Sequence, residues 1–548
     1  MTKLEIERTP SAYFYPLLIK NLLRPPLIYS PHQEIIYRNR MRYDYLTFEK
    51  RVARLANSLK KLDVRKGDTV AVMDWDSHRF LECFFAIPMT GAVLHTINVR
   101  FSPEEIIYTI NHAEDDVIIV NADFLPKLEA VKNQFTTVKK IILINETGAL
   151  PETSLKMDGE YEDLLAESQI EYDFPDFNEN TIATIFYTAG TTGWPKGVYF
   201  SHRQIVLHTY GLMSGLCAYK SQVSLDSGDV YMPLTPMFRI HSWGLPYLCT
   251  LLGTKQVYPG HAEPETILKL IEKEGVTFSH CVSTVMHMLM QCPVVKDMDL
   301  SRLKIMIAGS SLPKDLCKEA MDLGINLFSS YGMSETCPLL TVANLKPHML
   351  DWDLDKQVEI RSCAGLPVPL VQLEVIDWEG MPVPHDGKST GEIVARTPWL
   401  TQGYIKDPEG SEMLWKNGWL HTGDIGNIDP EGYLQVTDRL KDIIKTGGEW
   451  ISVLKLEEII IRHEAVMDAA VVGVPDKKWG ERPLVLLVLK DEYKGKVEEK
   501  DFKDFYKKFA DAGILPRYGI PDRVVIVDHI AKSRVGKIDK KIIREQFD

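Results

Sequence analysis

The sequence predicts an α/β protein of two domains. We expect a large N-terminal domain of mixed and parallel sheets flanked by helices, and a small α+β C-terminal domain joined to it by a hinge. The chain has 548 residues, more than one hydrophobic core usually holds. With 45% hydrophobic and 25% charged residues, its composition is that of a globular protein. Short β-prone runs also alternate with helical patterns up to Asn145, as they do in parallel sheets.

The alternation of helix and strand begins at Tyr45. Apolar residues three or four positions apart predict a helix over Tyr45–Val64, and the run Thr69–Met73 predicts a strand. The acidic stretch Gly148–Asn180 is irregular and is expected to be a connection. Between them the pattern predicts a helix over 79–89, a strand over 115–120, a helix near 124–135 and a strand over 140–145.

A loop rich in glycine and small hydroxyl residues follows the β-prone run Ile185–Tyr187. From Thr188 it reads Thr-Ala-Gly-Thr-Thr-Gly-Trp-Pro-Lys-Gly-Val. Gly190 and Gly193 permit close backbone approach, so N–H groups and hydroxyls can surround a phosphate, and Lys196 can add a positive charge. A Walker A loop requires glycine directly before the lysine, where this chain has proline. An ordinary turn between two strands is the alternative interpretation.

The pattern continues after this loop. A strand over Gly197–Phe200 precedes a helix that starts at His202, where Ser201 and Gln204 form a capping box. The apolar segment Met232–Trp243 is broken by prolines and fits a buried loop. Further along, the sequence predicts strands over 277–279 and 304–308, with a helix near 284–291 between them.

A charged, glycine-containing segment at Asp438–Ser452 separates two well-patterned regions, which makes it a candidate linker. Beyond it we expect a small domain. Its predicted elements are a helix over 454–463, strands over 469–474 and 484–490, and a charged amphipathic helix over 498–512.

A second motif stands at Ser329–Thr336, with the sequence Ser-Ser-Tyr-Gly-Met-Ser-Glu-Thr. The ring of Tyr331 can stack on a base, Ser334 can hydrogen-bond a phosphate, and Glu335 can hold a cation. This motif, the threonine-rich loop and a terminal Gly536-Lys537 occur in the order typical of the adenylate-forming (AMP-binding) superfamily, which the chain therefore resembles. The string Gly448–Ser452, Gly-Glu-Trp-Ile-Ser, is closest to prokaryotic medium- and long-chain fatty acyl-CoA synthetases.

The resemblance implies an ATP site. It places Mg²⁺ on Thr191 and Glu335, and it gives Asp424 the two ribose hydroxyls to bind. The residues that it assigns to ATP or AMP are Thr188, Ala189, Gly190, Thr191, Thr192, Gly193, Lys196, Gly309, Ser310, Ser329, Ser330, Tyr331, Gly332, Met333, Ser334, Asp424, Arg439 and Lys441.

The resemblance also implies the catalytic and hinge residues. In the family, the terminal lysine bridges the carboxylate substrate and the α-phosphate, so Lys537 is expected to be catalytic, together with Glu335 and Thr191. Lys441 stands at the pivot between domains 1–438 and 439–548. The residues expected at the hinge and the coenzyme A site are Lys441, Lys445, Gly448 and Trp450.

The acyl pocket is expected to contain Phe238, Arg239, Trp243 and Gly332. Trp243 stands where long-chain fatty acyl-CoA synthetases carry a gating tryptophan. Gly332 stands where acetyl-CoA synthetases carry tryptophan, which disfavours acetate. Arg239 departs from the family, which usually has histidine there, and a fixed cation beside an aliphatic chain is costly unless it is paired.

Composition excludes other classes of partner. A formal net charge of −13 without a basic tract disfavours nucleic acid. Eight scattered cysteines without a C-x-x-C pair fit a reducing cytoplasm and disfavour disulfides or a cysteine-rich zinc site. No run reaches the roughly 18 apolar residues of a membrane span, and the N-terminus lacks the apolar core of a signal peptide. We therefore expect a cytoplasmic location.

The expected function is that of an acyl-CoA synthetase, with ATP, Mg²⁺ and coenzyme A, acting on a medium- or long-chain fatty acid. A CoA ligase for a short hydroxy acid or an aryl acid is an alternative, as is another adenylating enzyme such as a luciferase-like oxygenase or a carrier-protein ligase. A third alternative is a non-catalytic nucleotide-binding or regulatory protein that has the fold of the family but not its activity. Related fatty acyl-CoA synthetases form dimers, and for this chain a homodimer stays open.

Overall fold

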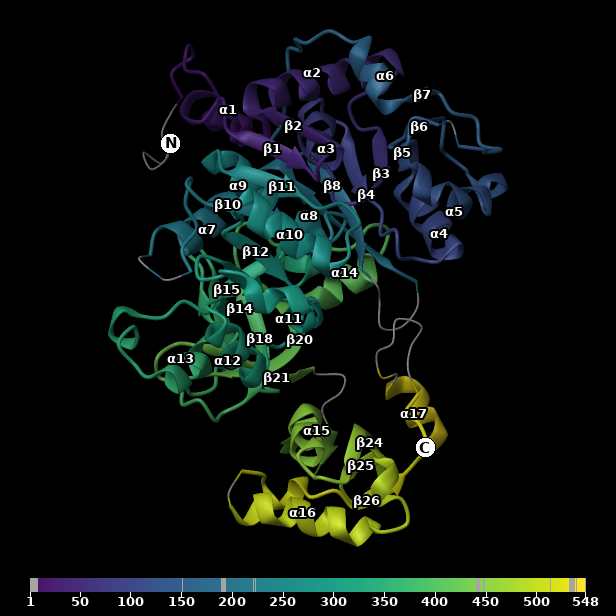
Figure 1. Cartoon of the computed structure of the whole chain (residues 1–548). Helices are drawn as coiled ribbons and strands as arrows, with labels where there is room; N and C mark the ends of the chain where they lie inside the picture. Colours follow the sequence, from purple (N-terminus) through teal and green to yellow (C-terminus); the bar gives the residue numbers. More distant parts are fainter. Residues whose placement is uncertain are drawn as a thin grey trace, which may run out of the picture. The chain divides into compact units, whose positions relative to one another are not determined.

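The computed structural model describes residues 8–149, 151–188, 194–219, 221, 223–439, 444–446, 449–512, 514–531, 538 and 540–547. For Arg439, Lys445, Glu449, Trp450 and Lys541 it describes the backbone alone. The chain divides into two compact units, shown in Figure 1. The large unit comprises the chain up to Gln372 and residues Ala395–Leu420, and the small unit comprises Leu373–Val394 and the chain from His421.

The large unit contains a seven-stranded sheet in the order β7-β6-β5-β3-β4-β8-β9. Neighbouring strands are parallel except β8 and β9, which are antiparallel. The inner strand β3 is buried along its whole length, as expected of an apolar run covered on both faces. The strands are β3 Thr69–Met73, β4 Val93–Thr96, β5 Asp115–Asn121, β6 Lys140–Ile144, β7 Gly159–Glu160, β8 Ile182–Thr188 and β9 Lys196–Ser201.

A second sheet in the large unit has nine strands in the order β16-β15-β14-β13-β12-β10-β11-β1-β2. Its centre, from β14 to β1, is parallel, and antiparallel pairs stand at both ends. The strands are β1 Glu34–Tyr37, β2 Met41–Asp44, β10 Val230–Pro233, β11 Lys255–Tyr258, β12 Phe278–Cys281, β13 Lys304–Ile307, β14 Asn326–Gly332, β15 Leu339–Val342 and β16 Leu366–Pro367.

Helices cover these sheets, and α2 is an amphipathic example. In α2, Phe48, Val52 and Leu59 recur on one face and are buried, and Asp44 caps the helix by accepting from the Thr47 amide. Ser201 and Gln204 form the predicted capping box of α7. The helices are α1 Lys20–Tyr29, α2 Tyr45–Lys61, α3 His78–Met89, α4 Pro103–Ala113, α5 Leu125–Glu129, α6 Tyr161–Ala166, α7 His202–Cys217, α8 Ile240–Trp243, α9 Leu245–Leu252, α10 Pro264–Glu274, α11 Ser283–Gln291, α12 Lys314–Asp322, α13 Leu354–Arg361 and α14 Pro408–Leu414, with a short strand β19 Trp415–Lys416 after them.

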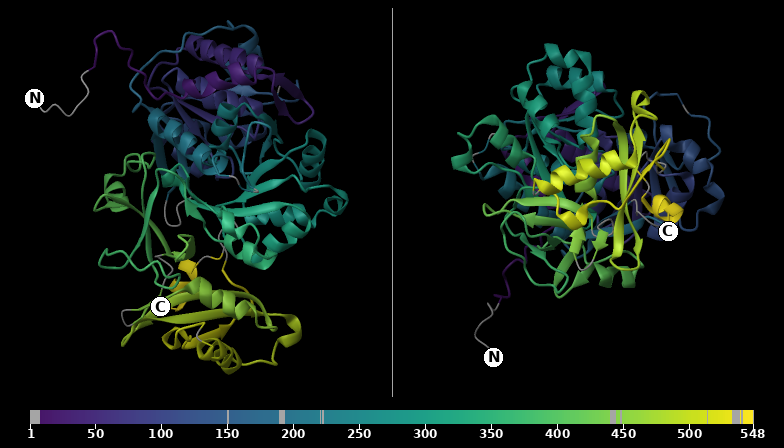
Figure 2. Two further views of the ribbon diagram at one scale, coloured as in Figure 1. Left: turned by 90° about the vertical axis from the view of Figure 1, so that its left-hand side faces the viewer. Right: turned by 90° about the horizontal axis from the view of Figure 1, so that it is seen from below.

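The small unit contains two sheets, seen from two sides in Figure 2. Apolar residues alternate between the faces of β24 and β25: Val471 and Val485 face a core with α15 and α16, whereas Val472 and Leu486 face α17. The elements are β17 Gln372–Ile376, β18 Gly391–Arg396, β20 Trp419–Ile428, β21 Leu434–Arg439, β22 Ile444–Thr446, β23 Glu449–Ile451, α15 Val453–Ile461, β24 Val466–Asp476, β25 Gly480–Leu489, α16 Glu499–Asp511, β26 Arg523–Ile526 and α17 Lys540–Phe547.

Two expectations about local structure were wrong. The helix predicted near 124–135 ends at Glu129, and a 3-10 turn follows at Lys132–Gln134. Between them, Val131 turns its side chain into the core, 3% exposed, and its φ of −123° is outside the helical range. The expected connection 148–180 contains β7 and α6. Helix α6 lies beside α2 in Figure 1 and buries Tyr161 and Leu165.

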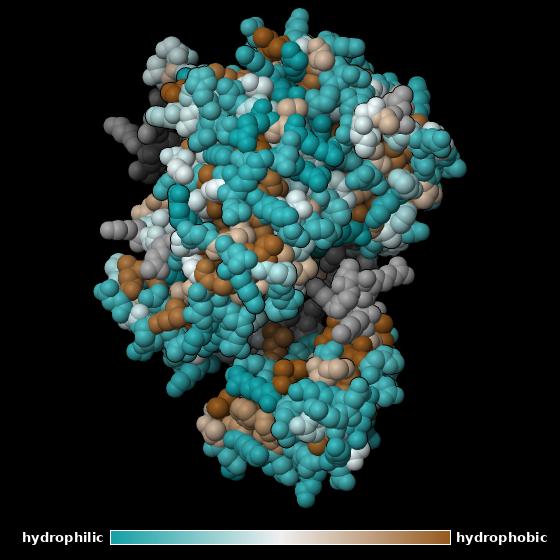
Figure 3. Space-filling model, viewed as in Figure 1, coloured by the Kyte–Doolittle hydropathy of each residue, from teal (hydrophilic) through white to brown (hydrophobic). Residues whose placement is uncertain are grey.

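Over the residues described, no helix is long and apolar enough to cross a membrane. The face of the molecule in Figure 3 is mostly hydrophilic, with hydrophobic residues scattered between.

Candidate active site

The threonine-rich loop connects β8 to β9, and Thr188 lies directly opposite Lys196 in that antiparallel pair. Ala189, Gly190, Thr191, Thr192 and Gly193 lie outside the described residues. The sequence therefore placed this loop correctly between two strands, and the two residues that flank the hairpin connection are both predicted phosphate ligands.

Helix α4 holds both ends of this hairpin. The ring of Trp194 stacks on that of Tyr108, with 4.8 Å between centroids, and Tyr108 stacks in turn on His112 at 5.2 Å. The Nδ1 atom of His112 lies 2.7 Å from the hydroxyl of Tyr187. Because Tyr187 precedes Thr188 and Trp194 precedes Lys196, these aromatic contacts fix where the loop leaves and re-enters the sheet.

Lys196 contacts a loop that is distant in sequence. Its Nζ lies 3.0 Å from Oδ2 of Asp407 and 4.5 Å from the centroid of the Tyr404 ring. Asp407 also caps α14, because its Oδ1 accepts from the amide of Gly410 at 2.8 Å. The Gly410 amide and then Lys196 lower the pKa of Asp407. A carboxylate therefore faces the predicted phosphate-binding cation.

Glu335 lies in a 3-10 turn at Ser334–Thr336, directly after β14. Its side chain is 8% exposed, and its Oε1 accepts from the hydroxyl of Tyr404 at 2.7 Å. Its carbonyl oxygen accepts from the amide of Thr401 at 3.0 Å. The hydroxyl of Thr336 bonds the amide of Met333 and fixes the turn. Tyr404 thus touches both Glu335 and Lys196.

The other residues of the second motif belong to β14, and the Gly309 turn follows the neighbouring strand. Ser329 pairs with Ile307 of β13, and Ser330 donates to the carbonyl of Ile307 at 3.3 Å. Gly309 has φ +72°, and Ser310 accepts from the Ser283 amide at 3.1 Å. Strands β13 and β14 thus bring these predicted nucleotide residues to one sheet edge; Tyr331, in the same strand, is 9% exposed.

Trp243 lies against this edge. Its ring is 5% exposed and packs on His280, with 4.9 Å between centroids, and its Cζ2 would lie 3.9 Å from a Cβ at Gly309. It ends a segment, Ile240–Trp243, whose four φ values are 49° to 58°. Left-handed non-glycine residues cost about 1 kcal/mol each. Buried hydrogen bonds offset this cost: His241 Nε2 lies 2.6 Å from the Thr184 hydroxyl, and Ser242 Oγ donates to the Thr235 carbonyl at 2.6 Å.

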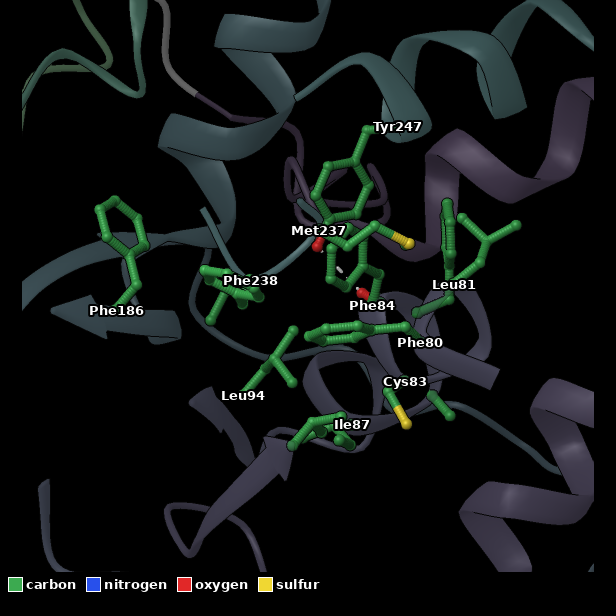
Figure 4. Close-up of a cluster of buried hydrophobic side chains, with 14 of the residues drawn as sticks. Phe80, Leu81, Cys83, Phe84, Ile87, Leu94, Phe186, Met237, Phe238 and Tyr247 are labelled. Carbon is green, nitrogen blue, oxygen red and sulfur yellow. Dashed lines mark hydrogen bonds between the residues drawn. The ribbon is translucent and has the colours of Figure 1, made fainter. Parts of the chain in front are cut away.

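Phe238 and Arg239 differ in their surroundings although they are neighbours. Phe238 is 4% exposed and belongs to the buried cluster of Figure 4, with Phe80 and Leu94. Arg239 is exposed, and its guanidinium has no hydrogen bond or ion pair with any residue described. Desolvation by the surrounding protein atoms, and then the cation of Arg100, lower the pKa of Arg239 although its side chain reaches solvent. A cation without a partner among the described residues therefore stands next to an apolar cluster.

Asp424 and Arg439 are direct partners across β20 and β21 in the small unit. Asp424 is 8% exposed, and its amide donates to the hydroxyl of Thr422 at 3.1 Å. Two residues that the family resemblance assigns to the nucleotide thus share one position of the ladder. Of the remaining predictions, Lys441, Gly448 and Lys537 lie outside the described residues, and Lys445 and Trp450 are described by their backbone in β22 and β23.

Comparisons with known proteins show the family of this chain. The family model of the AMP-binding enzymes matches residues 29–405, and that of their C-terminal domain matches residues 455–537. The chain belongs to the AMP-binding enzymes. It is an acyl-CoA ligase of the adenylate-forming superfamily, and thus an acid–thiol ligase that forms AMP.

Relatives of this AMP-binding enzyme have different acids in their names. A long-chain-fatty-acid–CoA ligase of Thermus thermophilus is 38% identical, with 92% of this chain and 90% of the relative covered. A medium-chain-fatty-acid–CoA ligase of Ectopseudomonas oleovorans is 35% identical, with 91% and 89% covered. A 3-methylmercaptopropionyl-CoA ligase of Ruegeria lacuscaerulensis is 34% identical, with 97% of each chain covered.

Solved structures show the same fold. The anthranilate CoA ligase AuaEII, in complex with anthranoyl-AMP, has a TM-score of 0.78 at 22% identity, with 97% of this chain and 98% of that chain covered. A fatty acyl CoA synthetase of Mycobacterium tuberculosis has a TM-score of 0.73 at 24% identity, with 97% and 98% covered. The mixed α/β architecture predicted from the sequence is therefore confirmed.

The surroundings of Glu335 fit the magnesium ion expected in this AMP-binding enzyme. Among the residues described, no group of three or more histidine, cysteine, aspartate or glutamate side chains could hold a metal ion. Mg²⁺ bound with a nucleotide uses one or two protein carboxylates and completes its shell with phosphate oxygens and water. The single, largely buried carboxylate of Glu335 matches that donor set.

The sequence did not single out Thr401, Tyr404 or Asp407 as site residues. Tyr404 follows Gly403, and nothing in its local pattern distinguishes it from a tyrosine in an ordinary turn. The sequence Asp407-Pro408 is typical of a helix start, with aspartate as the cap and proline as the first helical residue. This pattern could have indicated that Asp407 holds a fixed position, but not that it faces Lys196.

Proposed function

We propose that this acyl-CoA ligase activates a medium- or long-chain fatty acid. In the first step the carboxylate attacks the α-phosphate of ATP, which forms an acyl-adenylate and releases pyrophosphate. In the second step the thiol of coenzyme A attacks the acyl carbon, and AMP leaves. The observation that supports the adenylation step is that Lys196 and Glu335 both contact the side chain of Tyr404, because we propose the first as a phosphate ligand and the second as a metal ligand.

Catalysis of the first step rests on charge and position. Negative charge grows on the phosphates in the transition state, and Lys196 and Lys537 are suited to stabilise it. Mg²⁺, held by Glu335 and Thr191, would neutralise phosphate charge. Asp424 and Arg439 would hold the ribose, while Ser329–Ser334 and Gly309–Ser310 would hold the adenine and phosphates. Thr188 and the remaining loop residues would complete this cradle.

The second step requires Lys537 to leave, because the thiol must reach the same carbon. We propose a rotation of domain 439–548 against domain 1–438 about Lys441, with Lys445, Gly448 and Trp450 facing coenzyme A. The two family models leave residues 406–454 between them, which is consistent with a hinge in that interval.

The acid is inferred from two features. We propose that Trp243, which packs on His280 beside Gly309, gates the acyl pocket, and the fatty-acid ligases of Thermus and Ectopseudomonas support an alkyl substrate. Arg239 favours a second candidate, an acid with a polar or anionic group such as a hydroxy acid, or an aryl acid. That candidate has the support of the Arg239 guanidinium, for which no ion pair is found among the described residues.

Pyrophosphate release across a panel of acids tests this function. The panel runs from C2 to C18 with hydroxy, dicarboxylic and aryl acids, with and without coenzyme A. A maximum at C6 to C16 supports the fatty-acid proposal. A maximum at the polar or aryl acids makes Arg239 the specificity residue instead. No release with any acid contradicts both.

Two further properties are proposed with the function. The eight free cysteines, five of them buried, fit a reducing compartment, which supports a cytoplasmic location. A homodimer is proposed from the behaviour of related fatty acyl-CoA synthetases, and sedimentation velocity of the full chain tests it.

A further inference from the structure

We name the loop Thr401–Asp407 the crossing loop. It is hydrogen-bonded to Glu335 on one side and to strand β9, which follows the threonine-rich loop, on the other. At its start, the amide of Thr401 donates to the Glu335 carbonyl at 3.0 Å. Near its end, Tyr404 pairs with Val198 of β9, and the amide of Ile405 donates to the Gly197 carbonyl at 2.9 Å. Because its main chain is bonded on both sides, the side chains of the crossing loop are held in fixed positions.

Tyr404 donates a hydrogen bond to a carboxylate that the proposed function assigns to a metal ion. Its hydroxyl lies 2.7 Å from Oε1 of Glu335. A tyrosine hydroxyl is protonated at neutral pH and a glutamate carboxylate can only accept, so Tyr404 is the donor of this bond. A hydrogen bond from a fixed phenol sets the orientation of the Glu335 carboxylate, which matters because Mg²⁺ demands near-octahedral geometry.

Asp407 presents a carboxylate to the cation that the proposed function assigns to a phosphate. The pair is close, with 3.0 Å between Nζ and Oδ2, although Lys196 is 45% and Asp407 36% exposed. The bond from Gly410 to the other oxygen of Asp407 fixes this carboxylate at the start of α14. A phosphate oxygen that approaches Lys196 therefore meets a competing anion already in place.

We propose that the crossing loop tunes the nucleotide site through two positioning residues: Tyr404 orients Glu335 for the metal ion, and Asp407 competes with the nucleotide phosphates for Lys196. This inference rests on the proposed function. The two residues act in opposite directions, since Tyr404 favours binding of magnesium-ATP and Asp407 weakens it.

Asp407→Asn tests the competition. Asparagine keeps an oxygen that can cap α14 but removes the negative charge beside Lys196. An exposed ion pair is worth little, so we expect the KM for ATP to fall by about two- to fivefold, and the Kd for magnesium-ATP measured by calorimetry without acid to fall equally. Glu409→Gln is the matched control, because Glu409 is exposed, lies two residues away and carries the same charge.

Tyr404→Phe tests the orientation. Phenylalanine keeps the ring beneath Lys196 and removes only the hydroxyl that bonds Glu335. We expect the Mg²⁺ concentration for half-maximal pyrophosphate release to rise by about three- to tenfold. The Kd for Mn²⁺ in the ATP complex, measured by electron paramagnetic resonance, should rise in parallel. Tyr404→Leu removes the ring as well and should in addition raise the KM for ATP.

The inference fails if Asp407→Asn leaves ATP affinity unchanged or weakens it, or if Tyr404→Phe binds the metal ion as the unchanged protein does. Denaturant unfolding of each variant shows whether it is folded. The calorimetric and Mn²⁺ measurements need no acid substrate. They therefore test the crossing loop even if the unchanged protein turns over no acid. That last result would contradict the proposed function but not the role of the crossing loop.

Discussion

Gly332 lies against the carbonyl oxygen of Pro338 where β14 pairs with β15. A Cβ built at Gly332 would come 1.9 Å from that oxygen and 3.1 Å from the Cα of Leu339. No carbon atom can approach a carbonyl so closely, so the pairing of the two strands requires glycine here. The pairing of β14 with β15 therefore explains why glycine stands at position 332, whatever the length of the acid substrate.

Gly332→Ala should therefore destabilise the protein. Forcing β15 away from β14 is an overpacking change, for which we expect a loss of about 1–3 kcal/mol in the free energy of unfolding. Urea denaturation measures it. Gly228→Ala is the control, because only the side-chain end of Asp226, at 3.1 Å, would meet its new methyl group. Full stability together with a shifted chain-length preference would instead show that Gly332 lines the acyl pocket.

Asp76 predicts a pH dependence of stability. It follows β3 and accepts from the amide of Met237, at 2.6 Å, next to the predicted acyl-pocket residue Phe238. Burial raises the pKa of Asp76 from 3.8 to about 7. The folded protein therefore holds this proton more tightly than the unfolded chain, and the stabilising contribution present at low pH is lost as pH rises through 7.

Asp76→Asn removes this titration and keeps an acceptor for Met237. The free energy of unfolding of the variant, minus that of the unchanged protein, should grow between about pH 4 and 7. At about 1.4 kcal/mol per unit the limit is about 4 kcal/mol, reduced to the extent that water reaches the carboxylate. Chemical denaturation at four pH values measures the difference. A difference that stays flat over this range would contradict the raised pKa.

Arg239→Gln should change which acid is preferred. It removes the cation, which has no ion pair with any described residue, and keeps a polar side chain. If Arg239 recognises a second anionic group, kcat/KM for a dicarboxylic acid should fall by about tenfold relative to the monocarboxylic acid of equal length. Steady-state kinetics on matched pairs of acids measure this ratio, with the exposed Arg302→Gln as control. An unchanged ratio places Arg239 outside the specificity site.

Lys537→Ala should separate the two half-reactions. Loss of a cation that stabilises the pentavalent phosphate should slow adenylate formation by about 10²–10³-fold. Thioester formation from supplied acyl-adenylate should change little, because the lysine acts only in the first step. Single-turnover assays of each half-reaction measure both rates, with Lys496→Ala as control. Equal loss of both half-reactions would show that Lys537 has another role.

Local patterns predicted most of the secondary structure. The buried stripe of α2, the strand Thr69–Met73 and the capping box of Ser201 and Gln204 all depend on residues within a few positions of each other. Helix α6 escaped prediction for a physical reason. It has only six residues, and its Glu162 forms an ion pair with Arg51 of α2, which is distant in sequence. The distance between the Arg51 guanidinium nitrogen and the Glu162 carboxylate oxygen is 2.9 Å.

The candidate site was predicted in part. Thr188, Lys196 and Glu335 come from motifs that can be recognised along the chain. The contacts that hold them cannot be recognised in this way, since Tyr404 reaches Glu335 across 69 positions. Tertiary packing also gave Gly332 a role in strand pairing that sequence comparison alone could not separate from a pocket role.

The identity of the nucleotide products tests the central claim most directly. The full-length protein is incubated with ATP, Mg²⁺, coenzyme A and the preferred acid, and the products are separated by chromatography. The account predicts AMP, pyrophosphate and acyl-CoA in equal amounts, and acid-dependent exchange of pyrophosphate into ATP when coenzyme A is left out. Formation of ADP and phosphate, or thioester without pyrophosphate, would contradict activation through an acyl-adenylate.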